Sequence, residues 1–366
     1  MRSSSGQHFI ALDHVRALAA FMVFAWHFLH GGRGYPIAFG HAPVLIPAAL
    51  LDQGHLGVAL FMTLSGYLFA KLLNGQRVAY AAFLWNRVLR LLPLLLVVLA
   101  LVGLREWSAG MSIDTYMQSI AWGWLLPTLP KGAWSITVEF HFYLILPLLL
   151  WMARKSRWLP LSIIAGAIAL RAAIYLARGE VESLAYWTII GRIDQFVLGM
   201  LAFRFRDMLA GRHARAIVVL TAFSIFYWYI DALGGAFHAP AALWIILPTI
   251  EGFAFAAAIA WYDNSFKQRL SPLSHFIGRI GEYSYSIYLL HAFVVFRVAA
   301  YINAHVMPLS NFYVACAWSL LCFLAMVPIG YLSYHFVELP FLRLRRPYLL
   351  RRDNLSRATA VSEQVA

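Results

Sequence analysis

The sequence has few charged residues and almost no cysteine. Only 12% of its 366 residues are charged, against roughly a quarter in a soluble domain, so an ordinary soluble fold is excluded. The two cysteines, Cys316 and Cys322, lie in an apolar run, so neither a disulfide framework nor a zinc site is expected. No cleavable signal peptide is expected either, because the first apolar segment is long, offers no small-residue cleavage site and contains Asp13 and Arg16.

Apolar residues dominate what is present. They make up 62% of the chain, and the mean hydropathy is +0.70. In lipid each backbone amide must be paired within its own element, so apolar runs of about 20 residues indicate helices that cross a hydrocarbon core ~30 Å thick. A β-barrel would instead show short alternating segments. The sequence therefore predicts an all-α transmembrane bundle of about ten helices, at 10–30, 55–73, 88–104, 134–153, 158–177, 187–203, 216–231, 241–262, 280–303 and 312–336.

The net charge of +13 is explained by membrane topology. Basic residues occur in short clusters between apolar runs and not as one stripe with aromatic stacking platforms, so no nucleic-acid partner is expected. Most of the basic residues fall in those segments between spans that lie on the same side of the membrane as the N-terminus. Because positive residues prefer the cytoplasmic side, and an even number of spans puts both termini on one side, both termini are predicted to be cytoplasmic. Residues 1–345 are expected to form one membrane domain, and 346–366 a basic, disordered cytoplasmic tail.

The first span carries costly ionisable residues. Arg16 and His27 are eleven positions apart, which at ~100° per residue is about 20° more than three turns, so they share a helix face ~16 Å apart along the axis. Arginine binds phosphate in a bidentate manner, and histidine can remove a hydroxyl proton at neutral pH. The pair suits a long anionic substrate. The alternative is that Arg16 pairs with Asp13 and that His27 is an interfacial histidine without a catalytic role.

Two further pairs lie at helix starts. Arg87 and Arg90 are three positions apart at the cytoplasmic start of the third span, which predicts a second anion site, with positive-inside anchoring as the alternative. Ser135 and Glu139 are one turn apart at the outer end of the fourth span. They can bind a substrate hydroxyl, although Ser135 can equally act as a helix cap.

The last two spans add His291 and Glu338. His291 lies within the ninth span, and Glu338 lies near the cytoplasmic face at the end of the tenth. A structural ion pair with a nearby arginine is the expected role of Glu338.

Together these segments resemble acyltransferase family 3, whose bacterial membrane proteins acylate sugars of polysaccharides, lipopolysaccharides, Nod factors and antibiotics. In the first helix of the family an arginine is followed, after ten residues, by a histidine, and Arg16 and His27 match this pattern. The family's R-x-x-R pattern is matched by Arg87 and Arg90. A departure is Phe140-His141, where relatives commonly have a polar pair. The other matching segments are FMTLSGYLF, WSITVEFHFYLILP with Glu139, GRIDQFVLGMLAFR with Arg192, SYSIYLLH with His291 and HFVELPF with Glu338.

The resemblance implies an O-acyltransferase of the bacterial inner membrane. It implies acyl-CoA, usually acetyl-CoA, as the donor, a carbohydrate or glycolipid hydroxyl at the outer face as the acceptor, and neither a metal nor a permanently bound cofactor. His27 would be the general base or a transient acyl carrier, assisted by Arg16 and Glu139, while Arg87 and Arg90 would hold the donor phosphates. Supporting roles would fall to Asp13, Ser135, Arg192, His291 and Glu338.

Two other classes of function compete with this interpretation. Buried histidines, arginines and glutamates also form substrate paths in proton- or anion-coupled transporters. Such a transporter would show repeat symmetry and helices broken at the midplane, and neither is evident from the sequence. An inactive scaffold or sensor is the third class, and the presence of both Arg16 and His27 argues against it.

Overall fold

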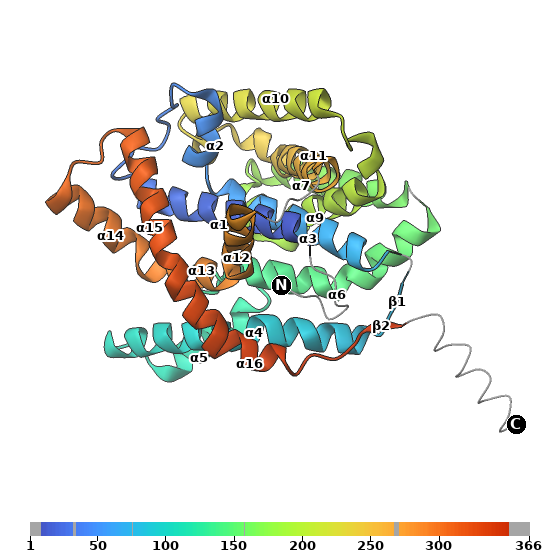
Figure 1. Cartoon of the computed structure of the whole chain (residues 1–366), viewed down its shortest axis with the longest axis horizontal. Coiled ribbons are helices and arrows are strands. Elements are labelled where there is room, and N and C mark those ends of the chain that lie inside the picture. Colours follow the sequence, from blue (N-terminus) through green and yellow to red (C-terminus); the bar gives the residue numbers. More distant parts are fainter. Residues whose placement is uncertain (1–8, 32–33, 75, 157, 267–270, 351–366) are drawn as a thin grey trace, which may run out of the picture.

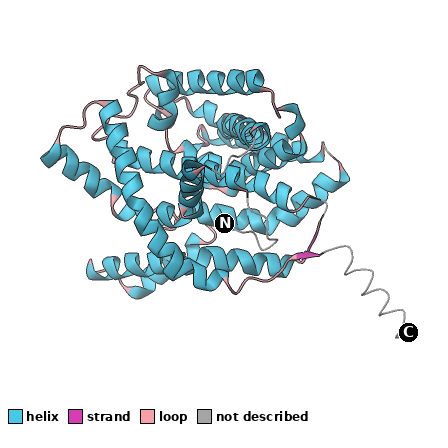
Figure 2. Cartoon of the chain, in the orientation of Figure 1, coloured by secondary structure: helices cyan, strands magenta, loops and turns pink. Residues whose placement is uncertain are grey.

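The computed structural model describes residues 9–31, 34–74, 76–156, 158–266 and 271–350. Helices joined by loops make up these residues, apart from one short antiparallel ladder of two strands (Figure 2). The ladder joins β1 (Arg77–Val78) to β2 (Leu349–Leu350). The helices are α1 (Ile10–His30), α2 (Ala49–Asp52), α3 (Leu56–Leu72), α4 (Tyr80–Ser108), α5 (Ile113–Gly123), α6 (Trp134–Lys155), α7 (Leu159–Arg178), α8 (Glu182–Trp187), α9 (Ile189–Arg204), α10 (His213–Ala232), α11 (Leu247–Ser265), α12 (Pro272–Glu282), α13 (Ser284–Leu290), α14 (Val295–Tyr301), α15 (Phe312–Ser333) and α16 (Leu339–Leu342).

Six of the described helices are long and apolar enough to cross a membrane. They are α1, α4, α6, α7, α10 and the continuous helix Phe312–Leu342, in which a π-helical turn joins α15 to α16. Two bent pairs raise the number to eight: Ile46–Asp52 with α3, bent by 88°, and Ser284–Phe293 with Val295–Val306, bent by 57°. The prediction of an all-helical, multi-pass membrane protein is therefore confirmed.

The count of ten spans exceeds what the described helices support. Helix α9 has only 16 residues, fewer than the roughly 17 that a spanning helix needs, although it coincides with the span expected at 187–203. The ninth expected span, 280–303, is interrupted by the bend that follows His291. Broken helices, which the sequence did not reveal, are thus present. The ten-span topology and the cytoplasmic position of both termini stay predictions.

Helices α1 and α3 lie at the centre of the bundle (Figure 1). Small residues let α3 approach α9 closely, as is usual between membrane helices. A Cβ atom on Gly199 would lie 2.0 Å from the Thr63 carbonyl oxygen, and one on Gly66 would lie 1.9 Å from that of Phe196. No side chain fits at either position without moving one helix away from the other.

The segment that follows α16 is held against the start of α4. Asn86 Nδ2 donates to the Arg346 carbonyl oxygen at 2.7 Å, and the Arg346 amide donates to Asn86 Oδ1 at 2.9 Å. Tyr348 is 1% exposed, and its carbonyl oxygen accepts from the Ala79 amide at 2.8 Å. Residues 346–350 of the expected tail are therefore docked on the bundle, and 351–366 lie outside the described residues. This docking brings Arg345 to the side of α4.

Candidate active site

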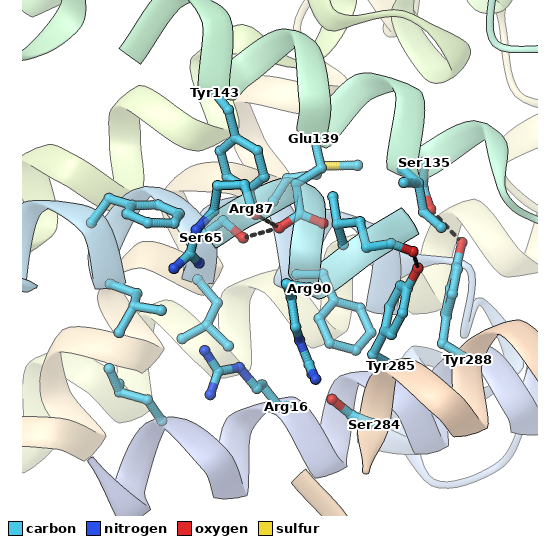
Figure 3. A pocket seen from close by; sticks show the side chains of 18 of the residues that line it. Arg16, Ser65, Arg87, Arg90, Ser135, Glu139, Tyr143, Ser284, Tyr285 and Tyr288 are labelled. Atoms are coloured by element: carbon cyan, nitrogen blue, oxygen red, sulfur yellow. Dashed lines mark hydrogen bonds between the residues drawn. The ribbon is translucent and has the colours of Figure 1, made fainter. Parts of the chain in front are cut away.

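A cavity opens among α1, α3, α4, α6 and α13, with an empty volume of about 1280 Å³. Its wall is apolar for most of its extent, with Leu12, Val58, Phe61 and Leu64 among the lining residues. Polar side chains project into it from several elements (Figure 3). The structure thus brings together residues that are far apart in the sequence.

Four arginines line this cavity: Arg16 from α1, Arg87 and Arg90 from α4, and Arg345 from the docked segment. Two of them are neutralised. Arg16 forms an ion pair with Asp13 one turn earlier on α1, and Arg90 forms one with Glu338, whose side chain is fully buried. The expected structural pairing of Glu338 is confirmed, and the Asp13 alternative for Arg16 is also observed.

Arg87 and Arg345 form no ion pair with any described carboxylate. In each, the Nε atom is buried and lacks a hydrogen-bond partner among the described residues. Arg87 lies over the rings of Phe69 and Tyr143, at 5.3 and 5.9 Å from their centroids, which favours a cation. Burial, reinforced by the positive charges of Arg87 and Arg90, lowers the pKa of Arg345 to about 9. The cavity therefore contains two arginines that have no ion-pair partner among the described residues and that can bind an anion.

Arg345 was not among the site residues expected from the sequence. It lies in the run RLRR after the last apolar segment, where positive-inside anchoring explains any basic residue. It reaches the cavity because the segment around it is docked on the start of α4, in part through the pairing of Asn86 with the adjacent Arg346.

Glu139 supplies the cavity with a carboxylate. It accepts hydrogen bonds from the Tyr143 hydroxyl and, at 3.4 Å, from Ser65 Oγ (Figure 3). Ser135, one turn earlier on α6, also lines the cavity, as expected, but it does not bond to Glu139. Its hydroxyl lies 2.8 Å from that of Tyr288, and the Tyr288 hydroxyl in turn donates to the Gly132 carbonyl oxygen at 3.0 Å. Two hydroxyl groups therefore meet at the wall formed by α6 and α13.

His27 is not among the residues that line the cavity. Its ring contacts His291, with centroids 4.9 Å apart, and His291 Nε2 lies 3.3 Å from His27 Nδ1. Tyr288 connects this pair to the cavity, since it lines the cavity and its ring centroid lies 5.9 Å from that of His291. Arg16 thus lines the cavity, whereas His27, which shares its face of α1, lies behind Tyr288 and His291.

Backbone carbonyls define the tautomers of the two histidines when they are neutral. His27 Nδ1 lies 2.8 Å from the Val23 carbonyl oxygen, and His291 Nδ1 lies 2.5 Å from that of Tyr288. A carbonyl oxygen only accepts, so Nδ1 carries the proton in both rings. The single His27 Nδ1–H is then shared between the Val23 carbonyl oxygen and, at the longer distance, His291 Nε2, and His27 Nε2 is left as the basic nitrogen.

Arg192 lies away from the cavity in a buried network. Its Nε donates to the Tyr186 carbonyl oxygen at 2.5 Å, and its Nη1 lies 4.0 Å from a Glu251 carboxylate oxygen. His141, the departure from the family pattern, contacts the Trp124 carbonyl oxygen at 2.9 Å and does not line the cavity. Neither residue is placed to touch a molecule in the cavity.

Among the described residues, no group of three His, Cys, Asp or Glu side chains is arranged to hold a metal ion. The polar groups that line the cavity are arginines, hydroxyls and carboxylates, with the imidazoles of His27 and His291 behind Tyr288.

Comparison with known proteins identifies the family. The acyltransferase domain family matches residues 9–332. A protein of Komagataeibacter xylinus named "Putative membrane-bound transacylase BcsY" is 28% identical over 235 residues, which cover 54% of this chain and 58% of that protein. No solved structure gives a significant match. Both matches support an acyltransferase of a membrane, and the chain belongs to acyltransferase family 3.

Proposed function

We propose that this protein is a membrane-embedded O-acyltransferase of the bacterial inner membrane. It takes an acyl group, most simply acetyl, from acyl-CoA on the cytoplasmic side and transfers it to a hydroxyl of a carbohydrate or glycolipid at the outer face. The observation that carries the proposal is the single cavity that joins two unpaired arginines to Glu139, Ser135 and Tyr288, with the His27 and His291 pair directly behind Tyr288.

The donor suits this cavity because coenzyme A has phosphates at one end and a thioester at the other. Arg87 and Arg345 would bind the phosphates, since no described carboxylate neutralises them. Arg16 and Arg90 would attract the phosphates less strongly, because Asp13 and Glu338 already form ion pairs with them. The apolar wall accommodates the pantetheine and acyl portions. The expectation from the sequence was that Arg87 and Arg90 hold the donor phosphates; in this proposal Arg345 takes the place of Arg90 beside Arg87.

The chemistry would centre on His27. Its Nε2 removes the proton from the acceptor hydroxyl as the oxygen attacks the thioester carbonyl, and the C–S bond then breaks to release coenzyme A, which recovers the proton from His27. His291 accepts from His27 Nδ1–H and keeps the imidazole in orientation. In a variant of this route, His27 takes the acyl group from the donor, carries it transiently and passes it to the acceptor hydroxyl. No bound cofactor is required in either case.

Tyr288 and Ser135 would act at the part of the cavity wall that separates the cavity from His27 and His291. Their hydroxyls meet at 2.8 Å on the wall next to His291. A thioester that reaches His27 from the cavity would pass Tyr288, where a hydroxyl that gives up its present hydrogen bond can donate to the oxyanion that forms on the carbonyl. Glu139 would fix the positions of the Ser65 and Tyr143 side chains in the cavity wall, since both donate hydrogen bonds to its carboxylate.

The test is a transfer assay in liposomes that contain the purified protein. Acetyl-CoA labelled in the acetyl group is supplied on one side, candidate glycans on the other, and the His27→Ala protein is run beside the wild type. Label in the glycan with wild type alone supports the proposal. Label that accumulates unattached in the lumen would instead indicate a transporter, and full glycan labelling by His27→Ala would remove His27 from the mechanism.

A further inference from the structure

A second cavity lies where three helices end, and it shares no lining residue with the first. Its empty volume is about 1050 Å³. The C-terminal ends of α3, α6 and α9 and the start of α7 enclose it. The lining residues are Ala70, Leu73, Asn74, Leu150, Ala153, Arg154, Pro160, Met200, Leu201, Phe203, Arg204 and Arg206.

Three arginines supply the charge of this cavity, and backbone carbonyls hold each of them in place. Arg154 Nη2 donates to the Gln76 carbonyl oxygen at 2.6 Å, and Arg204 Nη1 donates to the Ala153 carbonyl oxygen at 2.8 Å. Arg206 Nη1 donates to the Phe203 carbonyl oxygen at 2.9 Å. All three arginines line the same cavity.

No described carboxylate forms an ion pair with any of the three. The helix ends supply part of the compensation, because the C-terminus of a helix carries partial negative charge. Each guanidinium has five N–H donors in a planar fork and directs one of them to a described carbonyl. The remaining donors suit the oxygens of a phosphate, which arginine binds in a bidentate manner.

Two exposed tryptophans lie close in the sequence to lining residues of the cavity. Trp151 on α6, three positions before Arg154, is 54% exposed, and Trp158, two positions before Pro160 of α7, is 55% exposed. In a membrane protein such side chains face lipid, and a tryptophan at a helix end marks the level of the headgroups. A ligand that joins a phosphate to long apolar chains fits both the arginines and a position at the headgroup level, whereas free phosphate would make no use of the lipid-facing surface.

We propose that this cavity binds the headgroup of an anionic phospholipid of the surrounding leaflet, with the acyl chains along the exposed faces of α6 and α7. Basic pockets between membrane helices on the cytoplasmic side are sites of this kind. The lipid would bridge the ends of α3, α6 and α9, two of which carry Ser65 and Glu139 of the first cavity. The proposal does not depend on the acyltransferase activity.

The experiment measures lipid retention by the whole purified chain in detergent. The probes are dioleoyl phosphatidylglycerol and dioleoyl phosphatidylcholine, counted on the protein by native mass spectrometry. The variant is Arg204→Gln with Arg206→Gln. The control, Arg212→Gln with Arg343→Gln, removes the same charge from exposed arginines outside both cavities. Size-exclusion chromatography of both proteins checks that they remain folded.

The expected result is preferential retention of phosphatidylglycerol by wild type and control, weakened about tenfold in the variant, because two charge-assisted contacts are lost. Equal retention of the two lipids by the wild type would overturn the proposal. So would undiminished phosphatidylglycerol on the folded variant. In further measurements inorganic phosphate or coenzyme A is added as a competitor, to distinguish a lipid headgroup from a soluble phosphate as the ligand. Displacement of the lipid by either competitor at low concentration would show that the site binds a soluble phosphate instead.

Discussion

Arg90 and Glu338 form a buried ion pair that ties the start of α4 to the π-helical turn between α15 and α16. Ser286 of α13 also donates to Glu338, so three separate helices meet at one carboxylate. Arg90 lies over the Tyr285 ring as well, at 5.2 Å from its centroid. Of the two arginines in the R-x-x-R pattern, Arg90 is thus bound into the scaffold, while Arg87 remains without a carboxylate.

Glu338→Gln is expected to destabilise the bundle. The substitution leaves the Arg90 guanidinium without its countercharge, and breaking a buried pair from one side costs about 3 kcal/mol. Thermal unfolding in detergent would measure the loss. The double variant Arg90→Gln with Glu338→Gln removes both charges and should recover much of the stability. A single variant as stable as wild type would contradict the structural role.

Arg87→Gln and Arg345→Gln are each expected to weaken acyl-CoA binding about tenfold, since each removes one charge-assisted phosphate contact. Titration calorimetry with a non-hydrolysable acyl-CoA analogue measures the affinity. Arg343→Gln is the matched control, because Arg343 lies two positions from Arg345 and is exposed and outside the cavity. If Arg345→Gln bound the analogue as tightly as this control, the docked segment would have no part in the donor site.

The affinity for the donor is also expected to fall as the pH rises through about 9. Burial lowers the pKa of Arg345 to about 9, so its charge is nearly complete at pH 7, half lost near pH 9 and mostly lost at pH 10. Only the charged form attracts phosphate, and the loss is therefore on the alkaline side. Affinity measured between pH 7 and 10 should show this step in the wild type and no step in Arg345→Gln. A step that persists in the variant would assign it to another group.

The sequence indicated much of this site because its residues stand in costly or regularly spaced positions. A charged residue in an apolar run, such as Arg16 or Glu139, needs a reason, and both line the cavity. Arg345 offers no such signal, since it lies in a basic cluster where charge is ordinary. Its role depends on the contact of Asn86 with Arg346 across 260 positions of the chain, which no local pattern encodes.

The separation of Arg16 from His27 could not be foreseen for a similar reason. Helix periodicity places the two on one face, and the structure preserves that relation. Whether one cavity reaches both depends on which side chains of other helices come between them. Tyr288, from a segment near the other end of the chain, lines the cavity next to His291, and His291 contacts His27.

His291→Leu is expected to lower kcat about 100-fold while leaving the KM for the donor unchanged. His291 Nε2 accepts from His27 Nδ1–H, and without it the imidazole loses one of its two orienting contacts. His291→Asn keeps an acceptor oxygen on that side and should recover part of the rate. Steady-state kinetics on both variants measures the effect. An equal loss in the two, or a raised KM, would indicate a packing role only.

Gly199→Ala is expected to destabilise the protein because it forces α9 away from α3. The new Cβ atom would lie 2.0 Å from the Thr63 carbonyl oxygen and 2.8 Å from the Tyr67 amide nitrogen, both of them backbone atoms that cannot rotate aside. Gly166→Ala in α7 is the control, since a Cβ atom there meets nothing within 4 Å. The control should gain up to about 1 kcal/mol from the higher helix propensity of alanine. Thermal unfolding of both proteins in detergent tests this, and equal stability of the two variants would contradict the close packing of α3 on α9.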